Sequence, residues 1–384
     1  MFCSYERTNT YVKLRTTYYF LTYSNCLHYI FSFLRYPSRK SHVRRQRAIP
    51  QSVPFPCEDA LSWGRSPERP TSVHRLRPGD IDVVAAIGDS LVAGSGALEE
   101  FALGAFVEYR GVSWCAGGDA SWREYLTLPN ILKEFNPNLR GYSTGTGEWL
   151  TRNAKFNVAF PVASDEDALK QAKIIVARMR SSLDIDIAND WKMVTVFIGA
   201  NDLCSASCLN PVSWSPAAHA KKLAIALDYL QKHLPRTIVN LVPVLVSIRV
   251  LRPMMCRLMH SLFCTCFHQN GNELYDLVRM ARLYQKAEVA LVSCIDNPRI
   301  LDQPFISYIT HDCFHFSQKG HALAANLLWN NLLEPIGNKT DNVPPILLRS
   351  FRCPTRRAPY LFTYKNSRSY MVTGKQAGAD DVFL

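Results

Sequence analysis

The fold of this chain is decided by residues 82–91, Asp-Val-Val-Ala-Ala-Ile-Gly-Asp-Ser-Leu. The stretch is a short apolar run that ends at Gly88 and is followed at once by polar residues. An uninterrupted apolar run bounded by glycine is typical of a strand that is buried on both faces of a parallel sheet. The polar residues that follow would then lie at the carboxyl end of that strand.

Three more runs predict strands, and helical patterns separate them. The strands are expected at 156–160, 192–198 and 237–246, and the second of these also ends at a glycine, Gly199. Ser164 is a plausible N-cap, because three acidic residues follow it and favour the positive end of a helix that runs to Met179. Further helices are expected at 217–233, 273–291 and 317–333. Strands alternating with helices predict an α/β fold with a parallel sheet covered on both faces.

The composition excludes several classes of protein. The chain has 384 residues, of which 47% are hydrophobic and 20% charged, so it can bury a large core and is not a disordered chain. The formal net charge of +12 suggests a nucleic-acid partner at first sight. However, residues 1–75 alone carry a net charge of +8, and no nucleic-acid-binding motif is present. We therefore expect no nucleic acid as a partner.

The N-terminal part reads as a segment outside the main domain. Residues 17–34 lack Lys, Arg, Asp and Glu, but polar side chains interrupt them and no small-residue cleavage site follows. They are a poor signal peptide and a marginal membrane span. The basic run 44–47 reads as a solvated linker rather than a protease processing site. Residues 48–76 also read as a linker, because they contain five prolines: Pro50, Pro54, Pro56, Pro67 and Pro70.

The twelve cysteines bear on the compartment. Several cluster in sequence, and in an oxidising compartment they would form disulfides. The alternative is a metal site built from Cys256, Cys264, Cys266 and His268, but its spacing matches no paired zinc motif, so disulfides are favoured. The sequon Asn338-Lys339-Thr340 agrees with secretion. We expect an extracellular or membrane-associated protein, although no clear signal sequence is recognisable.

Three short motifs stand at element ends and together predict ester hydrolysis. They are residues 88–91 after the first strand, residues 199–202 after the third, and residues 312–315 before the last helix. A serine hydroxyl needs a neighbouring base to become a nucleophile, and His315 suits that role for Ser90. Asp312 can orient the other nitrogen of the His315 ring. The Ser90 backbone N–H and the Asn201 side-chain amide are candidate donors to the oxyanion.

Two common hydrolase motifs are absent. No Gly-x-Ser-x-Gly elbow surrounds Ser90, because position 92 is valine, and no His-Glu-x-x-His zinc motif occurs. For a serine esterase mechanism we expect no metal and no cofactor.

The chain resembles the GDSL or SGNH hydrolase superfamily, and within it the animal phospholipase B branch. The resemblance runs from Pro54 to Ser367 and includes residues 109–114, 127–132, 201–204, 313–317 and 359–364. It implies a basic, aromatic-rich segment at 1–53, a lipase-esterase domain at 54–367 and a tail at 368–384. The implied fold is a flavodoxin-like α/β/α sandwich with a mostly parallel central sheet. Ser90, His315 and Asp312 are implied as the triad, and Asn201 as an oxyanion donor.

The resemblance also implies the substrates. They are the acyl esters of phospholipids and lysophospholipids, and some family members cleave retinyl or glyceride esters. The enzyme would meet these substrates at a membrane or micelle surface. We therefore expect a serine esterase of phospholipase A1/A2/B and lysophospholipase type.

Two departures from the family pattern support a second interpretation. The family has a glycine, whose backbone N–H helps to bind the oxyanion, at the position of Val162, and valine is more confined in φ/ψ. The segment between Glu273 and Asp312 is shorter than in the family, and Pro298 and Pro304 suit a loop better than the final strand expected there. The alternative is thus a weakened or inactive lipid-binding homologue.

Overall fold

A three-stranded parallel sheet forms the centre of the computed structural model, which describes residues 41–245, 254–267, 273–292, 306–339 and 347–378. Its strands are β1 (Val83–Gly88), β2 (Lys192–Phe197) and β3 (Thr237–Leu241), in the order β1-β2-β3. Gly88 pairs with Phe197, so β1 and β2 end side by side and the chain segments that follow them leave the same edge of the sheet. Three of the four predicted strands are confirmed, although β3 ends before the predicted boundary.

The prediction of a strand at 156–160 is wrong. This segment lies beside β1 but makes only an isolated parallel bridge between Asn157 and Ala86. The bridge consists of two backbone hydrogen bonds, from Ala86 to Phe156 and from Val158 to Ala86, each 3.0 Å long. Pairing stops there because Pro161 follows and the backbone turns. The apolar pattern was therefore correct about burial and about the neighbour, but not about the length of the pairing.

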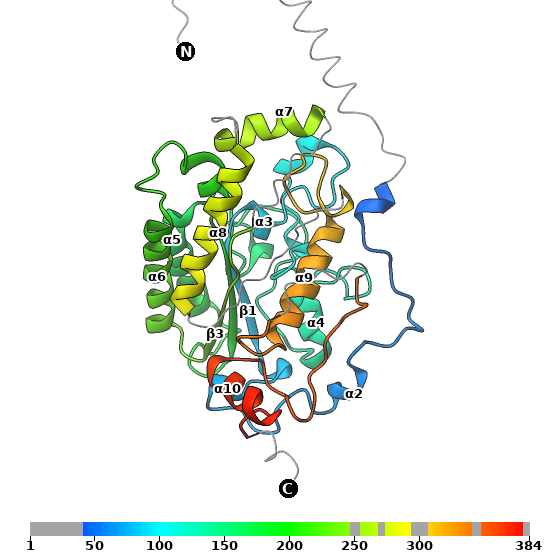
Figure 1. The fold of residues 1–384 in the computed structure, drawn as a ribbon. Helices are drawn as coiled ribbons and strands as arrows, with labels where there is room; N and C mark the ends of the chain where they lie inside the picture. Colours follow the sequence, from blue (N-terminus) through cyan, green and yellow to red (C-terminus); the bar gives the residue numbers. More distant parts are fainter. Residues whose placement is uncertain (1–40, 246–253, 268–272, 293–305, 340–346, 379–384) are drawn as a thin grey trace, which may run out of the picture.

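Helices cover both faces of the sheet, which confirms the α/β fold class (Figure 1). On one face lie α5 (Ala168–Ser181) and α6 (Pro216–His233), and α8 (Glu273–Val292) packs against α6. On the other face lie α3 (Ser90–Ala93), α4 (Leu128–Phe135) and α9 (Gln318–Leu332). The remaining helices are α2 (Glu58–Leu61), α7 (Met254–Phe263) and α10 (Tyr364–Thr373).

Side-chain caps fix where the main helices begin. Ser164 forms a capping box with Asp167, and one 3-10 turn at Asp165–Asp167 then leads into α5, so the predicted cap is confirmed. Ser215 caps α6, and Ser317 caps α9 by accepting from the Gly320 N–H at 3.1 Å. The Ser317 cap sits two residues after His315 and fixes where the segment that carries Asp312 and His315 meets α9.

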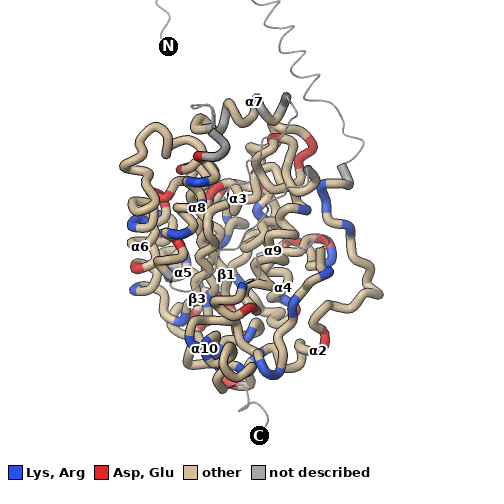
Figure 2. Tube along the Cα trace, in the orientation of Figure 1, with Lys and Arg blue, Asp and Glu red and all other residues tan. Residues whose placement is uncertain are grey.

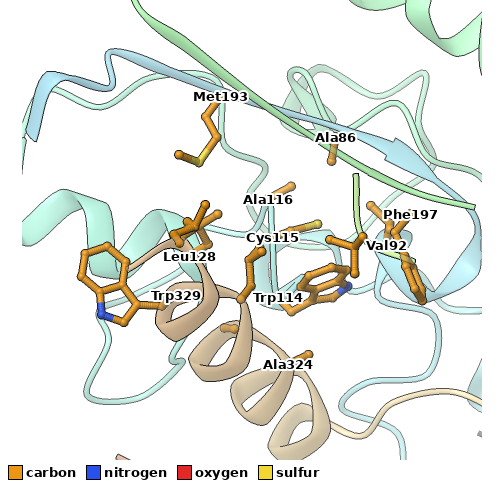
Figure 3. Packing of buried hydrophobic residues seen from close by; sticks show 14 of the residues in the cluster. Ala86, Val92, Trp114, Cys115, Ala116, Leu128, Met193, Phe197, Ala324 and Trp329 are labelled. Atoms are coloured by element: carbon orange, nitrogen blue, oxygen red, sulfur yellow. The ribbon is translucent and has the colours of Figure 1, made fainter. Parts of the chain in front are cut away.

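The core beneath the catalytic elements is aromatic (Figure 3). Trp114 packs edge-on against Phe197 at 5.5 Å between ring centroids and lies close to Ala324 of α9. Trp329, also on α9, stacks on Phe135 of α4 at 5.6 Å. Packed aromatic pairs of this kind add about 0.5–1.5 kcal/mol beyond the area they bury. The core therefore holds α9 firmly against the side of the sheet on which Ser90 lies.

The prediction that residues 48–76 form a linker is wrong. Phe55 is buried and packs edge-on against Trp122, Phe135 and Phe351, with centroid distances of 5.2–5.9 Å. A disulfide joins Cys57 to Cys353. The prolines of this segment thus belong to an irregular but packed stretch of the domain, and its composition alone did not distinguish that from a spacer.

The basic run 44–47 is not simply solvated either. Arg44 donates from Nε to the Ile309 carbonyl at 2.9 Å, and Gln46 donates to the Trp122 and Arg123 carbonyls. The predicted poor signal peptide at 17–34 lies outside the described residues, as do residues 293–305 of the shortened segment before Asp312. Within the ranges that the structure describes, no helix is both long enough and apolar enough to cross a bilayer.

Candidate active site

Ser90 lies at the carboxyl end of β1, as the sequence predicts. It is the first residue of α3, and the Asp89 side chain caps this short helix by accepting from the Leu91 N–H at 2.9 Å. The side chain of Gln171 on α5 bonds Gly88 twice, to its N–H at 2.9 Å and to its carbonyl at 2.8 Å. These bonds fix the backbone on which the serine is presented.

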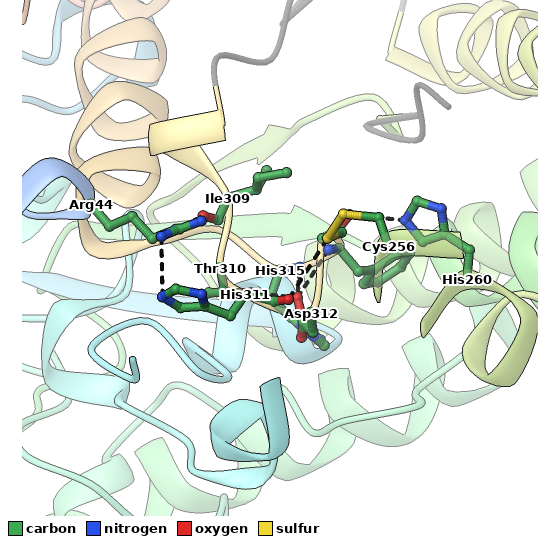
Figure 4. The surroundings of a disulfide bond; sticks show 10 residues. Arg44, Cys256, His260, Ile309, Thr310, His311, Asp312 and His315 are labelled. Atoms are coloured by element: carbon green, nitrogen blue, oxygen red, sulfur yellow. Dashed lines mark hydrogen bonds and ion pairs between the residues drawn. A yellow bond between two sulfur atoms is a disulfide. The ribbon is translucent and has the colours of Figure 1, made fainter. Parts of the chain in front are cut away.

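A tight loop at 309–316 carries the other two triad candidates (Figure 4). An antiparallel bridge between Ile309 and Phe316 closes the loop, and the Thr310 N–H donates to the His315 carbonyl at 2.8 Å. Within it, Asp312 Oδ2 lies 2.5 Å from His315 Nδ1. The other carboxylate oxygen accepts from the backbone N–H groups of Phe314 and His315 and from the Thr310 hydroxyl. The Asp312–His315 pair is therefore assembled as predicted.

Electrostatics favour a histidine that can accept a proton. Burial of the ring opposes its protonation, but the adjacent Asp312 carboxylate outweighs burial and raises the pKa of His315. Burial alone would raise the pKa of Asp312, but His315 and the hydrogen bonds above lower it, so Asp312 stays ionised. Such a pair stabilises the imidazolium that forms when the base takes a proton.

Asp89 is a second buried carboxyl group next to the serine. Burial raises the pKa of Asp89 to about 6. Its Oδ2 atom is buried and, among the residues described, has no hydrogen-bond partner. The charge of His315 lowers the pKa of Asp89, and the charge of Asp89 raises the pKa of His315. Across the described ranges no hydrogen bond joins Ser90 to His315, a contact that often forms only when substrate binds.

One hydrogen bond links Asn201 to Ala163, the residue that follows Val162. The Asn201 side-chain amide donates to the Ala163 carbonyl at 2.9 Å. An amide group has two N–H donors, so one remains for an oxyanion. Val162 is 80% exposed and has φ +65°, in the left-handed region that a β-branched residue rarely adopts. The backbone here thus keeps the conformation that a glycine would favour.

Several supporting residues were missed by the sequence reading. Arg110 is fully buried, pairs with Glu108, and donates to the carbonyls of Asn157 and Ala159. It thereby holds the segment that leads to Val162. The signal that was available is the charged pair itself, since Glu108 and Arg110 are the only charged residues in the sequence from Phe101 to Gly118. Nothing local in the sequence indicated Gln171, because its role depends on tertiary packing.

Disulfides, not a metal site, account for most of the cysteines. The bonds join Cys204 to Cys264, Cys208 to Cys266 and Cys256 to Cys313, in addition to the bond at Cys57. Three proposed metal ligands are therefore committed to disulfides, and the fourth, His268, lies outside the described residues. The bond at Cys313 attaches the loop between Asp312 and His315 to α7, and His260 of α7 contacts the Cys313 carbonyl at 3.0 Å (Figure 4).

An apolar cavity of about 250 Å³ lies between β3 and α9. Trp114, Phe197, Phe316 and Leu328 are among its lining residues, whereas Ser90, Asn201 and His315 are not. The cavity is thus adjacent to the core of the catalytic elements but is not the pocket of the serine.

A serine presented at a strand end and a paired His–Asp loop are the parts from which serine hydrolases build their active sites. Comparison with known proteins specifies the family, because the model of the GDSL-like lipase/acylhydrolase family matches residues 84–328. The chain belongs to this family of ester-hydrolysing enzymes.

Curated relatives support the same assignment. The chain is 37% identical over 373 residues to "Phospholipase B1, membrane-associated" of Mus musculus and 38% identical over 373 residues to that of Rattus norvegicus. These alignments cover 88% of this chain and 25% of each relative. The protein of the same name from Homo sapiens is 38% identical over 333 residues, which cover 80% of this chain and 22% of the relative. The chain thus spans about a quarter of the length of the curated relatives it matches.

Proposed function

We propose that this protein is a serine esterase that hydrolyses acyl ester bonds of phospholipids and lysophospholipids. The observation that carries the proposal is the paired Asp312–His315 loop together with Ser90 at the strand end. The two parts lie in adjacent segments, because the Gln318 N–H just after the loop donates to the Ala97 carbonyl just after α3 at 2.8 Å. The phospholipid substrate is supported by the names of the relatives, which are phospholipases.

Each step of ester hydrolysis can be assigned to residues of this site. His315 Nε2 takes the proton of the Ser90 hydroxyl as Oγ attacks the ester carbonyl carbon, and Asp312 holds the Nδ1–H. The tetrahedral oxyanion is bound by the backbone N–H groups of Ser90 and Val162 and by the free N–H of Asn201. Collapse of the tetrahedral intermediate breaks the ester bond, and His315 gives the proton to the leaving alkoxide. Water then hydrolyses the acyl-serine with His315 again as the base.

Fatty acid release tests this proposal. Purified protein should release fatty acid from phosphatidylcholine or lysophosphatidylcholine, and Ser90→Ala should reduce the rate by at least about a thousandfold. Equal release by wild type and Ser90→Ala would refute the assignment of the nucleophile. Retinyl and glyceride esters belong in the same assay as further substrates.

The alternative of a weakened or inactive lipid-binding homologue rests on Val162 and on the shortened segment before Asp312, of which residues 293–305 lie outside the described residues. The backbone at Val162 stays in the left-handed region, so a main-chain N–H remains available whatever the side chain. The Asp312–His315 pair is also complete. Both observations support the active enzyme over the inactive homologue.

We further propose that the substrate is met at a lipid surface. Exposed apolar side chains occur on segments that follow β1 and β2, namely Phe101 and Leu103 after α3, and Leu209 and Val212 after the Asn201 motif. Between Phe197 and Ser215 the single charged residue is Asp202, which is buried. Figure 2 shows the loop that leads into α6 as a stretch without charged residues. Such a surface suits contact with a membrane or micelle.

A matched pair of variants tests the lipid surface. Leu209→Asp with Val212→Asp should lower hydrolysis of phosphatidylcholine vesicles about tenfold or more and leave hydrolysis of a soluble short-chain ester unchanged. Leu183→Asp is the control, because Leu183 is fully exposed but lies before β2, at the opposite edge of the sheet. Equal losses on both substrates would contradict the docking role.

The disulfides support folding in the secretory pathway, since such bonds persist in oxidising compartments. Asn338 is exposed and is the proposed glycosylation site. Mass spectrometry of protein secreted from eukaryotic cells tests both the compartment and the glycan.

A further inference from the structure

A buried charge cluster lies directly behind the Asn201 motif, and the reaction described above does not use it. It consists of three carboxylates and two cations, from Asp165, Asp202, His219, Lys222 and Glu288. The side chains of Asp165, Asp202, His219 and Glu288 are all buried. Burying charge is costly unless each group has a partner, so the arrangement calls for an explanation.

His219 of α6 is the centre of the cluster. Its Nδ1 atom lies 3.2 Å from Asp165 Oδ2, and its Nε2 atom lies 3.1 Å from Glu288 Oε1 on α8. Two ionised carboxylates can accept from both ring nitrogens only when the ring is protonated. Burial opposes that charge, but the bonds to the two carboxylates outweigh burial and raise the pKa of His219 to about 9. Lys222 Nζ adds a second cation 2.7 Å from Asp165 Oδ1.

Asp165 connects His219 to the segment that carries Asn201 and Asp202. Its backbone N–H donates to both carboxylate oxygens of Asp202, at 3.1 and 3.2 Å. Two residues earlier, the Ala163 carbonyl accepts from Asn201. Segments 163–165 and 201–202 are therefore clasped by hydrogen bonds that run in both directions. Burial and the neighbouring Asp165 carboxylate raise the pKa of Asp202 to about 7. The positive charges of His219 and Lys222 act in the opposite direction and favour the ionised form of Asp202.

His219 also packs against the backbone that leads to Asn201. A side chain at Gly199, which has φ +126°, would meet His219 Cε1 at 2.9 Å. The ring of Tyr284 on α8 stacks on the His219 ring, with 4.4 Å between the ring centroids. The ring is held between two helices and the turn after β2, and it cannot shift without moving that turn.

The cluster is not assigned to a metal. Asp165, Asp202 and His219 lie close enough to hold a cation. However, His219 already uses both ring nitrogens and Lys222 already neutralises Asp165.

We propose that His219 is a positioning residue that fixes the oxyanion donor Asn201 through Asp165 and Asp202. The inference rests on the proposed function, because it assigns a task to Asn201 in that reaction. It predicts that loss of His219 impairs the stabilisation of the transition state more than the binding of substrate.

A double-mutant cycle on the full chain tests the inference with a soluble short-chain ester. Asn201→Ala should lower kcat about a hundred- to a thousandfold, as loss of an oxyanion donor does. His219→Gln, which removes the positive charge between the two carboxylates, should lower kcat at least about tenfold and change KM less than about twofold. In the Asn201→Ala background, His219→Gln should lower kcat less than about twofold, because the group that it positions is gone.

Controls separate positioning from general damage. His233→Gln makes the same substitution near the end of α6, away from the cluster, and should leave kcat unchanged. Glu288→Gln keeps an acceptor for the Val244 N–H but removes a charge, and it carries the same prediction if His219→Gln does not fold. Losses that multiply in the double variant would overturn the inference. Full activity of Ser90→Ala or Asn201→Ala would instead refute the proposed function.

Discussion

Replacement of Val162 by glycine probes the departure from the family pattern most sharply. Pro161 and Val162 are the central residues of a turn that the Ala163 N–H closes to the Phe160 carbonyl at 3.3 Å. Proline at the first central position and positive φ at the second define a type II turn, in which glycine is the preferred second residue. The native chain therefore places a β-branched residue where the backbone favours glycine.

The expected gain in stability follows from two opposing effects. The left-handed conformation costs an L-residue roughly 1–2 kcal/mol, and glycine removes that cost. Glycine also gains freedom in the unfolded chain, which opposes the benefit by about 0.5–1 kcal/mol. Because the Val162 side chain is 80% exposed, its removal loses little burial. Val162→Gly should therefore raise the free energy of unfolding by about 0.5–1 kcal/mol, or Tm by roughly 1–3 °C.

Activity should survive the same change, because the proposed donor is the backbone N–H rather than the side chain. We expect kcat on a soluble ester to be equal to or above that of the native protein. Thermal unfolding and initial rates measure the two effects on one preparation. Val212→Gly is the matched control, since Val212 is similarly exposed but has no positive φ, and it should be neutral or destabilising. A Val162→Gly protein that is less stable, or tenfold less active, would refute the reasoning.

Three further predictions concern the catalytic loop and its support. Because Asp312 raises the pKa of His315 above its ordinary value near 6.5, activity should fall as pH drops through a midpoint above 6.5, where the ring becomes protonated. Asp312→Asn should move that midpoint to lower pH and reduce kcat roughly ten-thousandfold, and an unchanged pH–rate profile would contradict the pairing. Replacing both Cys256 and Cys313 by serine opens a link between residues 57 apart in sequence. It should lower the free energy of unfolding by about 2–4 kcal/mol in denaturant titrations, and full retention of stability would show that the link is not needed. Arg110→Met leaves Glu108 buried without its partner and should cost about 3–5 kcal/mol, whereas a neutral effect would show that the ion pair is dispensable.

Much of the fold was predictable because its signals are local. Apolar runs ending at Gly88 and Gly199 marked two strands, and the carboxyl-end rule placed Ser90 and Asn201 at the same edge of the sheet. The three-residue spacing also predicted the contact between Asp312 and His315, which lies within one tight loop.

What the sequence did not reveal depends on tertiary packing. Phe55 is buried only because three aromatic rings from distant segments surround it, and a proline-rich composition cannot show that. The roles of Arg110 and His219 also require knowledge of which carbonyls and carboxylates fold around them. Disulfides were favoured because the cysteine spacing matches no paired zinc motif, but their partners are 57 to 296 residues apart and follow from the fold alone.

Labelling with a fluorophosphonate probe tests the central claim most directly, because such probes react covalently only with an activated serine. The account predicts one label per native molecule, located at Ser90 by peptide mass spectrometry, with competition by lysophosphatidylcholine and no label on Ser90→Ala. Folded protein that remains unlabelled, or that is labelled at another residue, would contradict it.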